Sequence, residues 1–214
     1  MLANTMLEGV LLLYVPFLIS TTFHEAAHAL TAKWGGDDTA YRGGQVSLNP
    51  IPHIQREPFG MVVLPLLLLF SSGFLIGWAS APIDPFWAAR HPKRAALVSL
   101  AGPFTNFLLA TVAFFALRYI VRSDLDIQEG SGRAVALITE SFLRLNIILG
   151  IFNLIPLPPL DGAGALEGFF PRVFGNLYGI LRSQPFIMLA VIYVVMSYGQ
   201  KLYMPVLRLV QSWL

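Results

Sequence analysis

Three ionisable side chains within one turn of an apolar segment have the spacing of a metal site. His24 and His28 are four residues apart, and Glu25 directly follows the first histidine, which makes an HExxH pattern. On an α-helix, positions i and i+4 lie on one face, so both imidazoles can bind one zinc ion. Glu25 would lie beside them and activate water for hydrolysis. Because ionisable groups are costly in hydrocarbon, a functional site is favoured over a chance cluster at the interfacial end of the helix.

A catalytic zinc site needs three protein ligands and one open position, so a third ligand must come from elsewhere. The remaining histidines are His53 and His91, and the carboxylates near the end of an apolar segment include Asp161. The chain has no cysteine, which excludes thiolate ligands and disulfides. The residues alone leave the choice of third ligand open.

Composition indicates that the helix carrying the HExxH pattern lies in a membrane. Of the 214 residues, 56% are hydrophobic and 12% are charged, whereas soluble domains have about 25% charged residues. A soluble protein of this size could not bury so much apolar surface, so we expect an all-α polytopic membrane protein. One domain, 1–214, is expected, with about four to five transmembrane helices. Five apolar segments supply them, at residues 7–32, 60–79, 95–119, 134–155 and 186–198.

Shorter patterns add detail to this organisation. The first segment has no basic residues before it and contains the HExxH pattern, so it is expected to be a retained span. Residues 45–49 alternate polar and apolar after two glycines, which predicts a strand of a short β-hairpin near the active site. Residues 166–182 mix aromatic and basic side chains, as in a helix on the membrane surface. Glu140 and Arg144 are expected to form a structural i, i+4 pair.

Several motifs together closely resemble the site-2 protease family of intramembrane metalloproteases. They are the HExxH pattern, Ala101-Gly102-Pro103 with Asn106, and Asn153 to Pro156 followed by Leu160-Asp161-Gly162. The stretch from Leu48 to His53 resembles the minimal subgroup without a PDZ domain. The resemblance covers about residues 20–165. It implies Asp161 as the third ligand, one Zn²⁺ ion, and an endopeptidase that cleaves transmembrane segments in regulated intramembrane proteolysis.

A topological argument independent of the family concerns segment 60–79. His24 and His28 lie toward the C-terminal end of the first span, and Asp161 follows the fourth segment. If segment 60–79 crossed the membrane, Asp161 would emerge on the opposite side from the histidines. If it is a re-entrant hairpin bending at residues 71–73, Asp161 returns to their side. Irregular backbone at this depth is tolerated where protein or water covers it.

The distribution of basic residues between the two sides of the membrane favours the re-entrant hairpin. It gathers eight of them on the side of the site, namely Lys33, Arg42, Arg56, Arg90, Lys93, Arg94, Arg172 and Arg182, against Arg118, Arg122 and Arg133 opposite. A crossing segment would give six and five, and the bias would nearly vanish. The positive-inside rule therefore predicts a multi-pass protein of the cell membrane, with its site toward the cytoplasm and its N-terminus outside.

Other residues have competing interpretations. Asn153 would bind the substrate or its developing oxyanion, or would only shape the loop before Pro156. His53 and Asn49 would line or gate the site, or would be ordinary loop residues. The core at 7–165 carries these residues, and 166–214 holds the interfacial helix and last span. We expect a membrane-protein substrate with a transmembrane helix, contact with the lipid bilayer, a regulatory membrane partner and no nucleic acid.

Two rival functions share the same ligands. One is a chaperone-like zinc-binding membrane protein without proteolytic activity, and the other is a metal transporter. A purely structural zinc site has no need of the base Glu25. Transporters commonly show internal repeats, and this sequence has none. The sequence therefore favours the peptidase.

Overall fold

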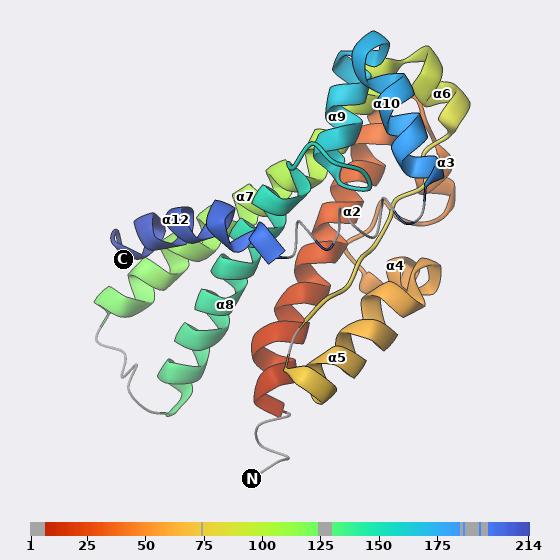
Figure 1. The fold of residues 1–214 in the computed structure, drawn as a ribbon. Helices are drawn as coiled ribbons and strands as arrows, with labels where there is room; N and C mark the ends of the chain where they lie inside the picture. Colours follow the sequence, from red (N-terminus) through yellow and green to blue (C-terminus); the bar gives the residue numbers. More distant parts are fainter. Residues whose placement is uncertain (1–6, 74, 124–129, 185, 187–192, 194–196) are drawn as a thin grey trace.

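Three long helices form the centre of the molecule and pack against one another (Figure 1). The computed structural model describes the chain except residues 1–6, 74, 124–129, 185, 187–192 and 194–196. The central helices are α2 (Val15–Gly35), α7 (Pro92–Arg122) and α8 (Gly130–Asn153). All three are long and apolar enough to cross a membrane, the first as Leu7–Gly35 because the π-helical turn η1 (Val10–Tyr14) precedes α2. The described residues therefore form a mainly helical membrane protein with several apolar helices.

The ends of these helices follow from local sequence. Gly36 ends α2 in the left-handed conformation (φ 96°), and its N–H bonds to the carbonyls of Ala32 and Lys33. Glycine adopts this conformation without the steric penalty that a β-carbon brings. Pro92 begins α7, where its missing N–H costs no helical hydrogen bond. The turn after α2 therefore starts at Gly36, three residues past Lys33, the last basic residue of the helix.

Segment 60–79 enters the molecule and returns, as the hairpin arrangement predicts. The turn η2 (Phe59–Val63) and helix α5 (Leu64–Ser72) run down beside α2, and Gly73 ends them with φ 72°. An extended stretch then climbs back toward α6 (Pro85–Arg90) (Figure 1). Its Trp78 N–H donates to the carbonyl of Gly60 at 3.1 Å. The start and the end of segment 60–79 therefore lie side by side. Helices α4 (Pro50–Arg56) and η2–α5 meet at 110°.

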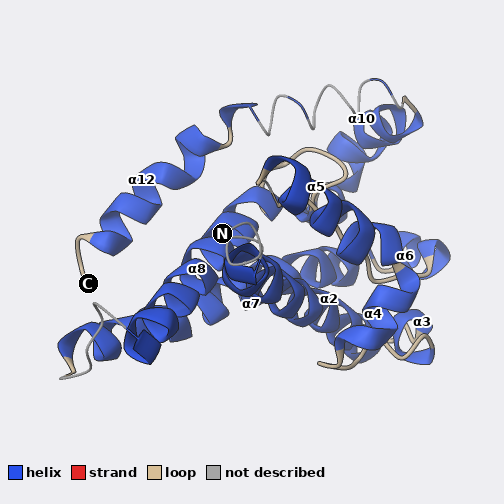
Figure 2. Ribbon diagram, turned by 90° about the horizontal axis from the view of Figure 1, so that it is seen from below, coloured by secondary structure: helices blue, strands red, loops and turns tan. Residues whose placement is uncertain are grey.

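The strand predicted at residues 45–49 is not formed. This stretch is a series of bends between the short helix α3 (Thr39–Arg42) and α4, and the described residues contain helices but no strand (Figure 2). The physical reason is that its backbone groups are satisfied locally. The Gln45 N–H donates to the Ala40 carbonyl (3.0 Å), the Asn49 N–H to the Ser47 hydroxyl (3.1 Å), and the Ser47 carbonyl contacts the His53 ring (2.9 Å). No partner strand is needed.

The C-terminal third covers one end of the central helices and then returns to the other. Instead of one helix over 166–182, the structure has α9 (Asp161–Phe169) and α10 (Pro171–Ser183). The break arises because a residue before proline is disfavoured in the helical conformation, and Phe170 has φ −131°. Helix α12 (Gln200–Gln211) packs on α8 at the far end. The predicted span 186–198 lies mostly outside the described residues.

The predicted pair between Glu140 and Arg144 is confirmed. An Arg144 guanidinium nitrogen lies 2.6 Å from the Glu140 carboxylate on α8. Both side chains are partly exposed, 34% for Glu140 and 48% for Arg144. Mutual neutralisation lowers the cost of placing either charge on a membrane helix. Neither side chain of the pair forms a hydrogen bond with His24, His28 or Asp161 in the described residues.

Asp37 fixes the turn that follows α2. Its carboxylate is buried and accepts hydrogen bonds from the Thr39 N–H (2.9 Å), the Thr39 hydroxyl (2.5 Å) and the Asp84 N–H (2.8 Å). Burial raises the pKa of Asp37, but these hydrogen bonds outweigh it and leave the pKa below its ordinary value. A carboxyl with a lowered pKa stabilises the folded state above its unfolded pKa, and this contribution is lost as pH falls through the folded pKa.

We expect Asp37→Asn to destabilise the protein by about 1–3 kcal/mol at neutral pH, because an amide N–H would face a backbone N–H. Thermal unfolding in detergent measures the effect, and the difference from wild type should shrink on acidification. Asp38→Asn is the matched control. The neighbouring Asp38 side chain is 53% exposed, and its ion pair with Arg42 is long at 4.0 Å. Equal melting temperatures for wild type and Asp37→Asn would contradict this role.

Candidate metal centre

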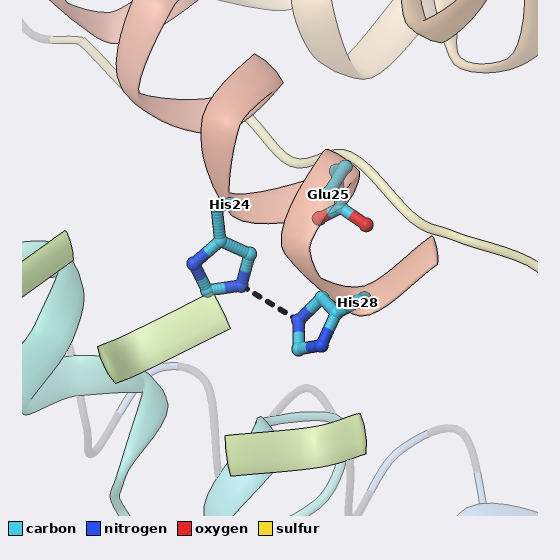
Figure 3. A group of neighbouring side chains, drawn as sticks. All are labelled: His24, Glu25 and His28. Atoms are coloured by element: carbon cyan, nitrogen blue, oxygen red, sulfur yellow. Dashed lines mark hydrogen bonds between the residues drawn. The ribbon is translucent and has the colours of Figure 1, made fainter. Parts of the chain in front are cut away.

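Helix α2 presents two imidazole rings on one side, as the HExxH spacing predicts. His24 and His28 are both buried, and their Nε2 atoms lie 3.0 Å apart. The rings meet edge to face with centroids 4.6 Å apart. Figure 3 shows the facing nitrogens and the Glu25 carboxylate on the same stretch of helix. Two nitrogen donors therefore converge on one point.

Asp161 lies at the same point, although it is 137 positions after His24 in the sequence. It is the first residue of α9, and its Oδ2 lies 3.0 Å from the Nε2 of His24 and 3.3 Å from that of His28. The loop before it is held by Tyr178 on α10, whose hydroxyl donates to the Pro156 carbonyl at 2.9 Å. Three potential ligand atoms thus gather from two helices.

Glu25 is buried at 5% exposure, and its Oε2 has no hydrogen-bond partner among the described residues. Its carboxylate and the two imidazoles have ligand atoms within 4.8 Å of one another. A buried carboxylate oxygen without a partner is costly unless water, substrate or a cation meets it. The position is suited to a base beside a metal ion.

The geometry around the two histidines fits a metal ion. The Nδ1 of His24 contacts the Asn106 side-chain oxygen (2.5 Å), and the Nδ1 of His28 contacts the Val98 carbonyl (2.6 Å). Both partners are acceptors, so each Nδ1 carries the proton and each Nε2 keeps its lone pair. Two facing lone pairs beside a carboxylate oxygen repel one another unless a cation lies among them. Nitrogen and oxygen donors of this kind are those that zinc prefers.

Gly102 on α7 leaves space for that ion. A β-carbon added at Gly102 would overlap the Nε2 atoms of both His24 and His28. The backbone of α7 therefore approaches the centre from the side opposite α2, and only glycine keeps the space free. From the sequence, the Ala101-Gly102-Pro103 motif was used only for the family resemblance, and this steric role was missed.

The remaining predicted site residues make their hydrogen bonds elsewhere. The Asn153 amide donates to the Leu149 carbonyl (3.0 Å) within α8. Asn49 caps α4 by accepting from the Ile51 N–H (3.0 Å), and His53 contacts the Ser47 carbonyl. His53 is nevertheless buried, and its Nδ1 has no partner within the described part of the chain. None of the three contacts the histidines of α2 or Asp161 through a hydrogen bond in the described residues.

Sequence reasoning did not assign Asn106 and Val98, which contact the two histidines, or Tyr178, which holds the loop before Asp161. The position of Asn106 in the Ala101-Gly102-Pro103 motif was the available signal, since a buried amide on an apolar helix needs a polar partner. Val98 acts through its backbone carbonyl, for which its side chain gives no signal.

Comparison with known proteins places these residues in a family. The family model "Peptidase family M50" matches residues 12–197. The chain is 34% identical over 183 residues to a Bacillus subtilis protein named "Putative zinc metalloprotease YwhC", covering 85% of this chain and 80% of that protein. It is 32% identical to a Mycolicibacterium smegmatis relative and 35% identical to a Mycobacterium tuberculosis relative, both named Rip2 with the same zinc metalloprotease description.

The matched region covers 74% and 71% of this chain, and spans only 58% and 54% of the two Rip2 proteins. No solved structure matches the chain. The family model covers most of the sequence, and it includes both the HExxH pattern and Asp161. The chain therefore belongs to peptidase family M50, the site-2 protease family, and is a metallopeptidase.

Proposed function

We propose that this protein is an intramembrane zinc endopeptidase that cleaves transmembrane segments of membrane proteins. The observation that carries the proposal is the convergence of His24, His28 and Asp161 on one point among membrane-length helices. A peptidase centre at this depth meets its substrate within or at the edge of the bilayer. The partners are a membrane protein with a transmembrane helix, the lipid bilayer and a regulatory membrane protein.

The residues of the centre take separate roles in this proposal. The imidazoles of His24 and His28 and the carboxylate of Asp161 hold a single Zn²⁺ ion. When bound, zinc supplies Lewis-acid polarisation of the scissile carbonyl and lowers the pKa of water. Glu25 takes one proton from the attacking water as the new C–O bond forms. It then returns this proton to the leaving amine nitrogen as the C–N bond breaks.

The orientation rests on the basic residues. Lys33 lies in the last turn of α2, Arg42 and Arg90 are the last residues of α3 and α6, and Arg94 donates to the Gly35 carbonyl at 3.1 Å. Figure 1 shows α3 and α6 beside the C-terminal end of α2. We place this end toward the cytoplasm of the cell membrane and the start of α2 toward the outside. The centre therefore receives water from the cytoplasmic side.

The decisive experiment uses the purified protein with a panel of single-span membrane proteins tagged at both ends. Cleavage fragments are mapped by mass spectrometry, with a soluble unfolded peptide as comparison. We expect cuts within apolar spans, none in the soluble peptide, and loss of cleavage on chelation with recovery on adding Zn²⁺. Cuts confined to soluble regions would contradict the proposal. Bound zinc without cleavage of any panel member would favour a zinc-binding membrane protein without proteolytic activity.

Ligand variants test the metal centre separately from cleavage. We expect His28→Ala and Asp161→Ala each to lose stoichiometric zinc, measured by elemental analysis after dialysis. His91→Ala is the control, because the His91 ring packs against that of Trp87 in a tilted arrangement (centroids 5.8 Å apart) and His91 belongs to the turn before α7. Full zinc content in Asp161→Ala would remove Asp161 from the ligand set.

A further inference from the structure

Behind His24, a chain of buried amides joins the three central helices. Asn106 on α7 contacts the Nδ1 of His24 through its side-chain oxygen and donates its N–H to the Asn146 side-chain oxygen on α8 at 2.9 Å. Asn146 in turn donates to the Ser20 hydroxyl at 2.9 Å. Ser20 lies one turn before His24, so the chain starts and ends on α2. Asn106, Asn146 and Ser20 are all fully buried.

The orientation of each amide in this chain is determined by its neighbour. Asn146 also donates to the Phe142 carbonyl at 2.9 Å. A backbone carbonyl only accepts, so the Asn146 nitrogen must face it and the Asn146 oxygen must face Asn106. That oxygen requires the Asn106 nitrogen, which leaves the Asn106 oxygen for His24. The Phe142 carbonyl thus orients Asn146, Asn146 orients Asn106, and the Asn106 oxygen is the atom that contacts the His24 imidazole.

We propose that Asn146, which does not touch the metal centre, is a positioning residue that holds His24 in its metal-binding tautomer by fixing Asn106. If Asn106 turned over, its N–H would face the Nδ1 of His24. The imidazole proton would then move to Nε2, and the lone pair that binds the metal would be lost. This inference rests on the proposed zinc centre. Groups that orient a ligating histidine typically contribute about 10- to 100-fold to metal affinity.

A purely structural role makes a different prediction. Buried amides hydrogen-bond across membrane helices and contribute to packing. If packing were the only role, any loss at Asn146 would lower stability and leave the affinity for metal nearly unchanged. The two roles separate in a pair of variants whose side chains have the same number of non-hydrogen atoms as asparagine. Asn146→Leu removes the acceptor that orients Asn106, whereas Asn146→Asp keeps an acceptor oxygen in either protonation state.

The test is a competitive Co²⁺ titration of the full-length apoprotein, followed by the visible d–d absorption of the bound ion, with melting temperatures measured in parallel. We expect Asn146→Leu to lower Co²⁺ affinity about 10- to 100-fold, and Asn146→Asp to retain affinity near wild type despite any loss of stability. Equal affinity in Asn146→Leu and wild type would overturn the inference, as would a parallel loss in both variants. Failure of wild type to bind Co²⁺ or Zn²⁺ would instead overturn the metal centre and this inference with it.

Discussion

Glu25→Gln is expected to reduce cleavage about 100- to 10,000-fold while zinc stays bound. Glutamine preserves the volume of the side chain but cannot accept the proton of the attacking water. The free Oε2 of Glu25 is the atom that would accept it, since no protein group in the described residues occupies it. Because Asp161 completes the ligand set in our proposal, removing the Glu25 charge leaves all three ligands intact.

The measurement pairs the initial rate of substrate cleavage with the zinc content of the same preparation. Glu8→Gln serves as the matched control, since Glu8 is exposed and precedes the same helix. Loss of both zinc and activity in Glu25→Gln would make Glu25 a ligand, not the base. Activity within a few-fold of wild type would remove Glu25 from the mechanism.

Gly102→Ala is expected to abolish zinc binding, and with it all cleavage. The new methyl group would overlap the Nε2 atoms of His24 and His28, which are the atoms that would bind the metal in our proposal. Relief would require α7 to move away from α2, and these two helices share an extensive interface. Densely packed interiors accommodate even one added methylene poorly. A single methyl group should therefore act as strongly as the loss of a ligand.

Gly175→Ala and Gly179→Ala are the controls, because an added β-carbon at either position meets no atom within 4 Å. Both lie inside α10, where alanine favours the helix by about 1 kcal/mol over glycine. We expect them to keep full zinc content and to match or exceed the wild-type melting temperature. Zinc bound at wild-type stoichiometry in Gly102→Ala would show that the ion does not use both Nε2 atoms.

Periodicity and composition were sufficient to predict the long helices and the shared face of the two histidines. A helix repeats every 3.6 residues, so the relation between His24 and His28 is local and follows from their spacing alone. The return of segment 60–79 was also predictable, because Asp161 had to reach the histidines. The three long spans needed only their apolar length.

Contacts that depend on tertiary packing were not predictable. Residues 45–49 alternate like a strand, but alternation does not reveal whether a partner strand exists, and here the backbone bonds to its neighbours instead. The contact of Val98 with His28 uses a main-chain carbonyl, which every residue has. The steric role of Gly102 depends on the distance between α7 and α2, and this distance cannot be derived from the sequence.

The separation of Asp161 from the histidines has a consequence for biosynthesis. Asp161 is 137 positions after His24, and α7 and α8 must both form before it can reach the centre. A ribosome releases the HExxH helix into the membrane long before the chain reaches Asp161. With Asp161 as third ligand, the emerging polypeptide has no complete active site while its early spans insert. On this assignment, the order of synthesis would delay hydrolysis until the helices have docked.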